Sequence, residues 1–208
     1  MTRPQAPIWL AASDMTAATL PAAWLIATGL RPRNLTERSQ LRRETACRII
    51  ALQLGGTAEQ VMIGHDIKGR PFLETPGETG LHLSLATRSG IVAVALARGP
   101  VGIDVERVDG AAALPFAALH QEEAAMLRGL PDHTRALAFA QLWAAKEAYV
   151  KALGTGFARA PESFAVTFSS ADRFEVADPL RAIASGGTST TIENGGQEIL
   201  AAAMIVLD

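Results

Sequence analysis

The chain has 208 residues, of which 49% are hydrophobic and 19% are charged, and its formal net charge is −2. Burial of that much apolar surface can offset chain entropy, which excludes intrinsic disorder, and the charge balance gives no global basic field for nucleic acid. Cys47 is the only cysteine, so an intramolecular disulfide and a cysteine-based zinc site are both excluded.

The N-terminal thirty residues are apolar in places but lack the profile of a signal peptide. Pro4, Pro7 and Pro21 interrupt them, and Asp14 lies among them. No run in the chain approaches the roughly 18 apolar residues of a membrane-spanning helix. We therefore expect a cytoplasmic protein that binds neither a membrane nor nucleic acid.

The first predicted helix begins after Asn34 and ends at Leu54. Asn34 is a capping residue with Glu37 three positions later, and Gly55 and Gly56 stop the helix. Apolar residues recur at helical spacing between these limits. The other face of this helix carries four arginines, Arg38, Arg42, Arg43 and Arg48. These arginines indicate either a solvated surface or an anion-binding patch.

Strands dominate the middle of the chain. A turn at residues 68–71 precedes a short strand at 72–74, and the alternation of residues 81–85 predicts another. Residues 91–97 form an uninterrupted apolar run, typical of a strand buried on both faces. A turn at 98–100 then leads into a strand over 101–105, so residues 91–105 are predicted to form a hairpin.

A mainly helical pattern covers residues 114–153, with a break at 129–132. Residues 163–168 and 199–207 are strand-like, and the stretch from 185 to 196 is rich in turn residues. This order predicts an α+β protein with two similar halves, 1–99 and 100–208. We expect each half to pack a small antiparallel sheet on a long helix, with a pseudo-two-fold axis between the halves.

Two carboxylates two positions apart define the first candidate site. On a strand, Asp104 and Glu106 leave the same face, while Ile103 and Val105 point to the other face and into the core. Like charges on one face repel each other unless a cation lies between them, and Mg²⁺ prefers such oxygen ligands together with phosphate and water. The alternative is a solvated acidic strand.

Glu147 supplies a third carboxylate in the middle of a predicted helix. Lys151 lies one turn later on the same stripe, and Lys146 is rotated from Glu147 by about 100°. An ordinary surface pair of Glu147 and Lys151, worth roughly 0.3–0.5 kcal/mol, is the alternative reading. The combination of three carboxylates and two lysines is the chemistry needed to hold a divalent cation on a phosphate-bearing substrate.

These segments resemble the paired motifs of the 4′-phosphopantetheinyl transferases, which are GIDxE and, some forty residues later, WxxKEAxxK. Residues 100–107 and 143–151 match both motifs. Residues 69–71 resemble the family's G-K/R-P, and 81–88 take the place of its HFNLSHS strand. The resemblance runs from about residue 38 to 168. It extends to the long, single-chain type known for activating the surfactin synthetase.

The resemblance implies an enzyme that moves phosphopantetheine from coenzyme A to a serine of an acyl or peptidyl carrier protein, releasing adenosine 3′,5′-bisphosphate. Asp104, Glu106 and Glu147 would hold Mg²⁺ with the coenzyme's pyrophosphate. Glu147 would take the serine proton, directly or through a metal-bound water. Lys146 and Lys151 would stabilise charge on the pyrophosphate.

The resemblance also implies contacts with the coenzyme's phosphates from Arg43, Arg70 and Ser84. One departure affects this set, because the chain has Ala86-Thr87-Arg88 where the family has Ser-His-Ser/Thr. Thr87 can donate one hydrogen bond but carries no charge, and Arg88 offers a charge one position later on the opposite face of the strand.

Two other functions remain open from the sequence. One is a relative that binds coenzyme or carrier with weakened catalysis, because of the missing histidine. The other is a Mg²⁺-dependent phosphohydrolase, against which the lysines beside Glu147 argue. With both halves in one chain, the long type implies a monomer. Candidates for contacts with the acidic carrier are Arg128, Arg135 and Arg159.

Overall fold

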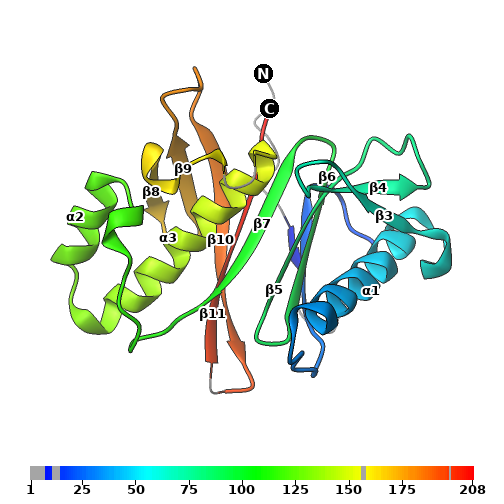
Figure 1. Ribbon diagram of the computed structural model, residues 1–208, viewed down its shortest axis with the longest axis horizontal. Coiled ribbons are helices and arrows are strands. Elements are labelled where there is room, and N and C mark those ends of the chain that lie inside the picture. Colours follow the sequence, from blue (N-terminus) through cyan, green and yellow to red (C-terminus); the bar gives the residue numbers. More distant parts are fainter. Residues whose placement is uncertain (1–7, 11–14, 156–157, 197) are drawn as a thin grey trace.

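Two sheets lie side by side at the centre of the protein, each flanked by a long helix (Figure 1). The computed structural model describes residues 8–10, 15–155, 158–196 and 198–208. Helix α1 (Leu35–Leu54) covers one sheet and helix α3 (Asp132–Leu153) covers the other. The predicted α+β class is confirmed. The pseudo-two-fold axis and the division at residue 100 stay predictions.

The first sheet has the order β1-β2-β6-β5 and is built from residues before Arg98. Its pairings are antiparallel except between β1 and β2, which run parallel. A separate two-stranded ribbon, β3 and β4, follows α1. The strands are β1 (Ile8–Leu10), β2 (Ala22–Ala27), β3 (Met62–His65), β4 (Pro71–Thr75), β5 (His82–Arg88) and β6 (Ile91–Ala97).

The second sheet has the order β7-β11-β10-β9-β8 and is antiparallel throughout. Helix α2 (Gln121–Gly129) precedes α3, and the helical structure is interrupted between them at the predicted position. Of the helices in the described residues, none is long and apolar enough to cross a membrane. The strands are β7 (Val101–Arg107), β8 (Ala165–Ser170), β9 (Arg173–Ala177), β10 (Ser185–Asn194) and β11 (Glu198–Val206). Short 3₁₀ turns are η1 (Ala58–Gln60), η2 (Phe116–Ala118) and η4 (Pro161–Ser163).

Helix α1 has the predicted limits. The Asn34 side chain accepts a hydrogen bond from the Glu37 amide at 2.9 Å, and Gly55 ends the helix in the left-handed conformation with φ 71°. The helical prediction from residue 114 is wrong for its first turns, because α2 begins only at Gln121. Its N-cap is His120, with Glu123 bonding back to the His120 amide at 2.9 Å.

The predicted hairpin over residues 91–105 is wrong. Strand β6 lies between β2 and β5, so both of its edges are paired within the first sheet. Strand β7 instead pairs with β11 in the second sheet. The turn-rich stretch at 185–196 also differs from prediction, since it contains β10, which pairs with β11 over eight residue pairs.

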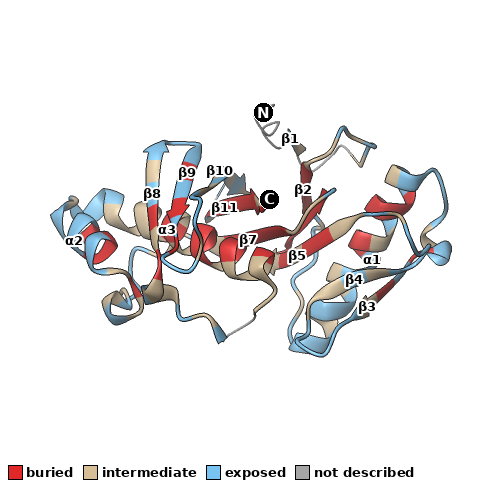
Figure 2. Ribbon diagram, turned by 90° about the horizontal axis from the view of Figure 1, so that it is seen from above, coloured by how far each residue is buried: buried red, intermediate tan, exposed pale blue. Residues whose placement is uncertain are grey.

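Three apolar clusters build the core. One lies between α1 and the first sheet, another between α3 and the second sheet, and the third between the two sheets. The buried stretches of β2, β7 and β11 lie in the middle of the molecule (Figure 2). Ile103 and Val105 belong to the cluster between the sheets, as predicted. The other face of β7 is therefore left to meet α3.

Candidate functional site

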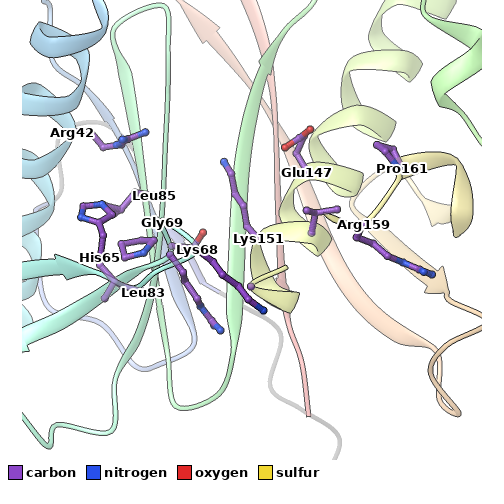
Figure 3. A pocket seen from close by; sticks show the side chains of 15 residues that line it. Arg42, His65, Lys68, Gly69, Leu83, Leu85, Glu147, Lys151, Arg159 and Pro161 are labelled. Atoms are coloured by element: carbon purple, nitrogen blue, oxygen red, sulfur yellow. The ribbon is translucent and has the colours of Figure 1, made fainter. Parts of the chain in front are cut away.

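A cavity of about 300 Å³ opens where the two sheets and their helices meet. We call it the main cavity because predicted site residues line it, although a hollow of about 1030 Å³ beside β9 and β10 is larger. Figure 3 shows α3 with Glu147 and Lys151 on one side of it and residues of the β3–β4 connection on the other. Helix α1 and strand β5 complete the wall. The lining residues used below are Arg42, Lys68, Arg70, Ser84, Glu147, Lys151 and Arg159.

The charged groups of the main cavity are mostly cationic. Glu147 is the single carboxylate among the lining side chains, against Arg42, Lys68, Arg70, Lys151 and Arg159. Such a set attracts an anion, and guanidinium groups bind phosphate oxygens in a bidentate way.

Arg70, for which the resemblance implies a contact with the coenzyme's phosphates, lies on the wall of the main cavity. Its guanidinium packs against Gly154, since a Cβ at that glycine would come within 2.8 Å of Arg70 Nη1. Gly154 has the left-handed φ of 66° that ends α3. The Nη2 group of Arg70 is buried and has no hydrogen-bond partner within the described part of the chain. A donor in this state is available to a ligand.

Arg42 rather than Arg43 lines the main cavity, and the phosphate contact expected of Arg43 stays a prediction. Arg43 is exposed and donates to the Ile63 carbonyl at 3.2 Å, so it holds β3 against the helix. One residue along a helix turns the side chain by about 100°, which separates the two roles. Burial, with a smaller contribution from Arg38, lowers the pKa of Arg42 below its ordinary value.

Lys68 and His65 belong to the main cavity but were not predicted. Lys68 stands beside the glycine-arginine-proline turn, so a search for basic residues around that turn could have found it. His65 carries no signal in the sequence, because it lies in the short strand β3. Both come from the ribbon that faces α3 across the cavity.

Asp104 and Glu106 share one face of β7, as predicted, and each is paired with a cation. Lys151 Nζ lies 2.6 Å from Asp104 Oδ1 and also donates to the Ile103 carbonyl at 3.1 Å. Arg88 Nη2 lies 2.5 Å from Glu106 Oε2. The two proposed metal ligands are therefore neutralised by side chains of α3 and β5.

Glu106 and Glu147 are both harder to ionise than an ordinary glutamate. Burial, followed by the charge of Asp104, raises the pKa of Glu147, and the charge of Lys151 opposes the rise. Burial and the Asp104 charge likewise raise the pKa of Glu106, against the opposing charge of Arg88. Glu147 contributes a smaller increase to Glu106. The three carboxylates thus act on one another electrostatically.

The three carboxylates do not form a closed metal centre as they stand. Across the described residues, no group of three or more His, Cys, Asp or Glu side chains is arranged to hold a metal ion. The donor set nevertheless fits a hard divalent cation. Asp104 Oδ2 is buried and lacks a hydrogen-bond partner among the described residues, and burial, followed by repulsion from the neighbouring carboxylates, raises the pKa of Glu106 and Glu147.

Lys146 does not join the other site residues. Its side chain is 1% exposed, and Nζ contacts Glu123 Oε1 at 2.7 Å and the carbonyls of Pro161 and Phe164 at 2.8 Å each. These contacts use all three ammonium donors, and Nζ also lies 4.2 Å from the Phe164 ring centroid. We correct the expected contact with the phosphates, because the rotation from Glu147 directs Lys146 into the core.

Arg159, expected among the carrier contacts, lies on the wall of the main cavity. It forms an ion pair with Asp178, which also accepts a hydrogen bond from the Tyr149 hydroxyl at 2.8 Å. Burial and this hydrogen bond raise the pKa of Tyr149. Together with Lys146, these contacts fix the segment around η4 that closes one side of the cavity.

The three residues of strand β5 that are expected to contact the coenzyme lie at two different cavities. Ser84 lines the main cavity and accepts a hydrogen bond from the Ile103 amide at 3.0 Å. Thr87 and Arg88 lie further along, at a second cavity of about 190 Å³ that also includes Arg31 and Arg38. Thr87 Oγ1 is buried and makes no hydrogen bond to the described residues. The second cavity is therefore also basic.

Comparison with known proteins identifies the class to which this site belongs. The sequence model of the 4′-phosphopantetheinyl transferase superfamily matches residues 100–202, which include Asp104, Glu106 and the whole of α3. This half of the chain is therefore similar to the 4′-phosphopantetheinyl transferase superfamily. The resemblance read from the two sequence motifs is thus confirmed at the level of the superfamily.

Two curated relatives carry names of the same kind. The chain is 30% identical over 101 residues to the 4′-phosphopantetheinyl transferase gsp of Aneurinibacillus migulanus, covering 47% of this chain and 40% of that protein. It is 34% identical over 120 residues to the 4′-phosphopantetheinyl transferase HetI of Nostoc sp. strain PCC 7120, covering 55% of this chain and 50% of that protein. The chain thus spans half or less of the length of these relatives.

Proposed function

We propose that this protein transfers 4′-phosphopantetheine from coenzyme A to a serine hydroxyl of an apo acyl or peptidyl carrier protein. The observation that carries the proposal is the main cavity. Basic residues from α1 and the β3–β4 connection face Glu147 and Lys151 of α3 across it, and Asp104 joins Lys151 at its edge. The coenzyme's pyrophosphate suits such a surface, because its charge is concentrated on oxygens that arginine and lysine bind.

In this reaction the carrier serine oxygen attacks the β-phosphorus of coenzyme A. A new phosphorus–oxygen bond forms, the pyrophosphate bond breaks, and adenosine 3′,5′-bisphosphate leaves with the bond's electron pair. We assign Glu147 to accept the serine proton, directly or through a metal-bound water, because it is the carboxylate that lines the main cavity. Lys151, Arg42 and Arg70 would stabilise the charge that builds on the leaving group.

Asp104, Glu106 and Glu147 would hold Mg²⁺, and the bound ion would supply positive charge to the pyrophosphate. This assignment rests on the unpartnered oxygen of Asp104 and the mutual repulsion of the carboxylates. Coenzyme phosphate contacts are proposed for Arg42 and Arg70, with Ser84 beside them. Thr87 and Arg88 are proposed for a further phosphate at the second cavity.

Transfer is tested by incubating the protein with coenzyme A, Mg²⁺ and several apo carrier proteins, and by measuring the mass of each carrier by mass spectrometry. We expect a mass gain of one phosphopantetheine group. Glu147→Gln should abolish transfer while leaving coenzyme A binding without metal within about twofold, because the base and a metal ligand are lost but the basic residues remain. No gain with any carrier would refute the proposal.

The same assay separates the alternatives. Magnesium-dependent coenzyme A binding without transfer would indicate a binding relative, which the missing histidine motivates. Release of inorganic phosphate from a phosphoester without any carrier would indicate a phosphohydrolase.

We propose a division of labour between the two halves of the chain. Residues 1–99 would supply coenzyme phosphate contacts, and residues 100–208 would supply the metal ligands and the base. The long single-chain type, a monomeric state and a cytoplasmic location remain predictions from the sequence.

A further inference from the structure

We propose that Arg88 is an exchangeable counter-ion that couples metal binding to coenzyme binding. It holds Glu106 while the metal position is empty, and it turns to a coenzyme phosphate at the second cavity once a divalent cation takes Glu106. This inference rests on the proposed function, because it uses the metal and coenzyme positions assigned there.

The Arg88–Glu106 pair is the first observation behind this coupling. Nη2 of Arg88 lies 2.5 Å from Oε2 of Glu106, a charge-assisted hydrogen bond between neighbouring edges of the two sheets. A divalent cation bound to Glu106 would repel the neighbouring guanidinium and draw electron density from the carboxylate that both share. Metal binding would therefore weaken the Arg88–Glu106 pair.

The second observation is where the released guanidinium can go. Arg88 lines the second cavity with Arg31, Arg38 and Thr87. The hydroxyl of Thr87 is buried there without a partner in the described residues, so this cavity wall carries an unused donor. A phosphate in this cavity would meet two further arginines and the free hydroxyl, and it would give Arg88 a new anionic partner.

The two events are linked because one side chain takes part in both. A metal ion that releases Arg88 makes the guanidinium available to the phosphate, and a phosphate that attracts Arg88 frees Glu106 for the metal. Linkage requires that each ligand raise the affinity for the other by the same factor. Free protein should accordingly bind metal weakly.

Arg107 offers a matched control for removing the charge of Arg88. Its side chain is 48% exposed against 45% for Arg88, and it follows Glu106 directly in the chain. It pairs instead with Asp109 at 2.6 Å and, more distantly, with Glu198 at 3.9 Å. Arg107→Gln thus removes a similar charge nearby without releasing Glu106.

The first experiment measures Mn²⁺ affinity by electron paramagnetic resonance, with the protein free of coenzyme. We expect Arg88→Gln to bind Mn²⁺ about fivefold more tightly than wild type, and Arg107→Gln to stay within about twofold. If both variants bound Mn²⁺ equally more tightly than wild type, the loss of any nearby positive charge would explain the effect, and the inference would be overturned. An unchanged Mn²⁺ affinity in Arg88→Gln would also overturn it. Asp104→Asn should weaken binding in every background.

The second experiment measures the affinity for adenosine 3′,5′-bisphosphate with and without saturating Mg²⁺. In wild type the metal should strengthen nucleotide binding, and in Arg88→Gln the strengthening should be about tenfold smaller, the loss of one charge-assisted hydrogen bond. If Mg²⁺ strengthened nucleotide binding in Arg88→Gln as much as in wild type, this inference would be overturned but the proposed function would not. Absence of Mn²⁺ binding from every variant would overturn the proposed metal site together with it.

Discussion

Glu106 and Glu147 are two carboxylates whose pKa values are raised, where a surface carboxylate paired with a cation normally has a lowered one. Their neighbours explain the difference. Burial and the Asp104 charge outweigh Arg88 at Glu106 and Lys151 at Glu147. These residues are therefore destabilising in the charged form until a cation neutralises them.

The raised pKa of Glu147 predicts how stability depends on pH without metal. Folding raises the pKa above the unfolded value, so the folded state binds more protons and the free energy of unfolding falls as pH rises through the interval between them. Glu147→Gln should be more stable than wild type at pH 7 in a chelator, and the advantage should vanish near pH 4. Urea denaturation across this range measures it, and a pH-independent difference would contradict the assignment.

The two lysines of α3 separate into a structural residue and a site residue. Lys146→Met leaves Glu123 as a buried, unpaired charge, so we expect a loss of about 3–5 kcal/mol in the free energy of unfolding. The Lys151 side chain is 32% exposed, so Lys151→Met should cost less stability than Lys146→Met but lower transfer at least about 100-fold. Urea unfolding and the carrier mass assay measure both. An equally stable Lys146→Met would contradict the buried role.

At the scale of elements, local signals predicted what they directly control. The asparagine cap and the two glycines limit α1 as expected, and Gly129 to Asp132 separates α2 from α3. The predicted hairpin over residues 91–105 was wrong because the neighbours of a strand depend on the topology of the whole chain, which no local sequence pattern contains. The turn prediction for residues 185–194 was wrong for a similar reason. Despite its glycines, this segment forms strand β10 because it pairs with β9 on one side and β11 on the other.

The candidate site divides in the same way. Alternation correctly put Asp104 and Glu106 on one face of β7, because the strand period is local. Helical rotation was the weaker guide on α1 and α3. It takes tertiary packing to decide that Arg42 faces the cavity, that Arg43 holds β3, and that Lys146 turns to Glu123.

The contact of β7 with α3 depends on a glycine. A Cβ at Gly102 would lie 1.8 Å from the Ala148 carbonyl oxygen and 2.7 Å from the Ala152 amide nitrogen, both backbone atoms that cannot turn aside. Gly102→Ala should therefore destabilise the protein by about 3 kcal/mol and displace Asp104, two residues on. Thermal or urea unfolding measures the loss.

The control for this change is Gly110→Ala. A Cβ there meets nothing within 4 Å, so its effect should stay within about 0.5 kcal/mol. A similar cost for both variants would show that general loss of backbone freedom, rather than the contact with α3, explains the effect.

At the scale of the whole molecule, the site exists because two sheets from different parts of the chain pack together. The cluster between them includes residues of β2, β5, β6, β7 and β11. Strand β5 lies beside β7, which brings Arg88 to Glu106 and Ser84 to Ile103 (Figure 1). The relative position of the sheets thus sets the distance between the basic residues and the carboxylates.

The bond from the Ile103 amide to Ser84 Oγ is a direct link between the sheets, and its removal tests how firmly they are held. Ser84 is 4% exposed, so Ser84→Ala leaves a buried amide without its acceptor and should cost about 1–3 kcal/mol. Hydrogen exchange at the Ile103 amide should accelerate correspondingly. Ser189→Ala is the control, since the equally buried Ser189 hydroxyl donates to the Ala202 carbonyl within one sheet. Unchanged exchange at Ile103 in Ser84→Ala would mean that packing alone holds β5 against β7.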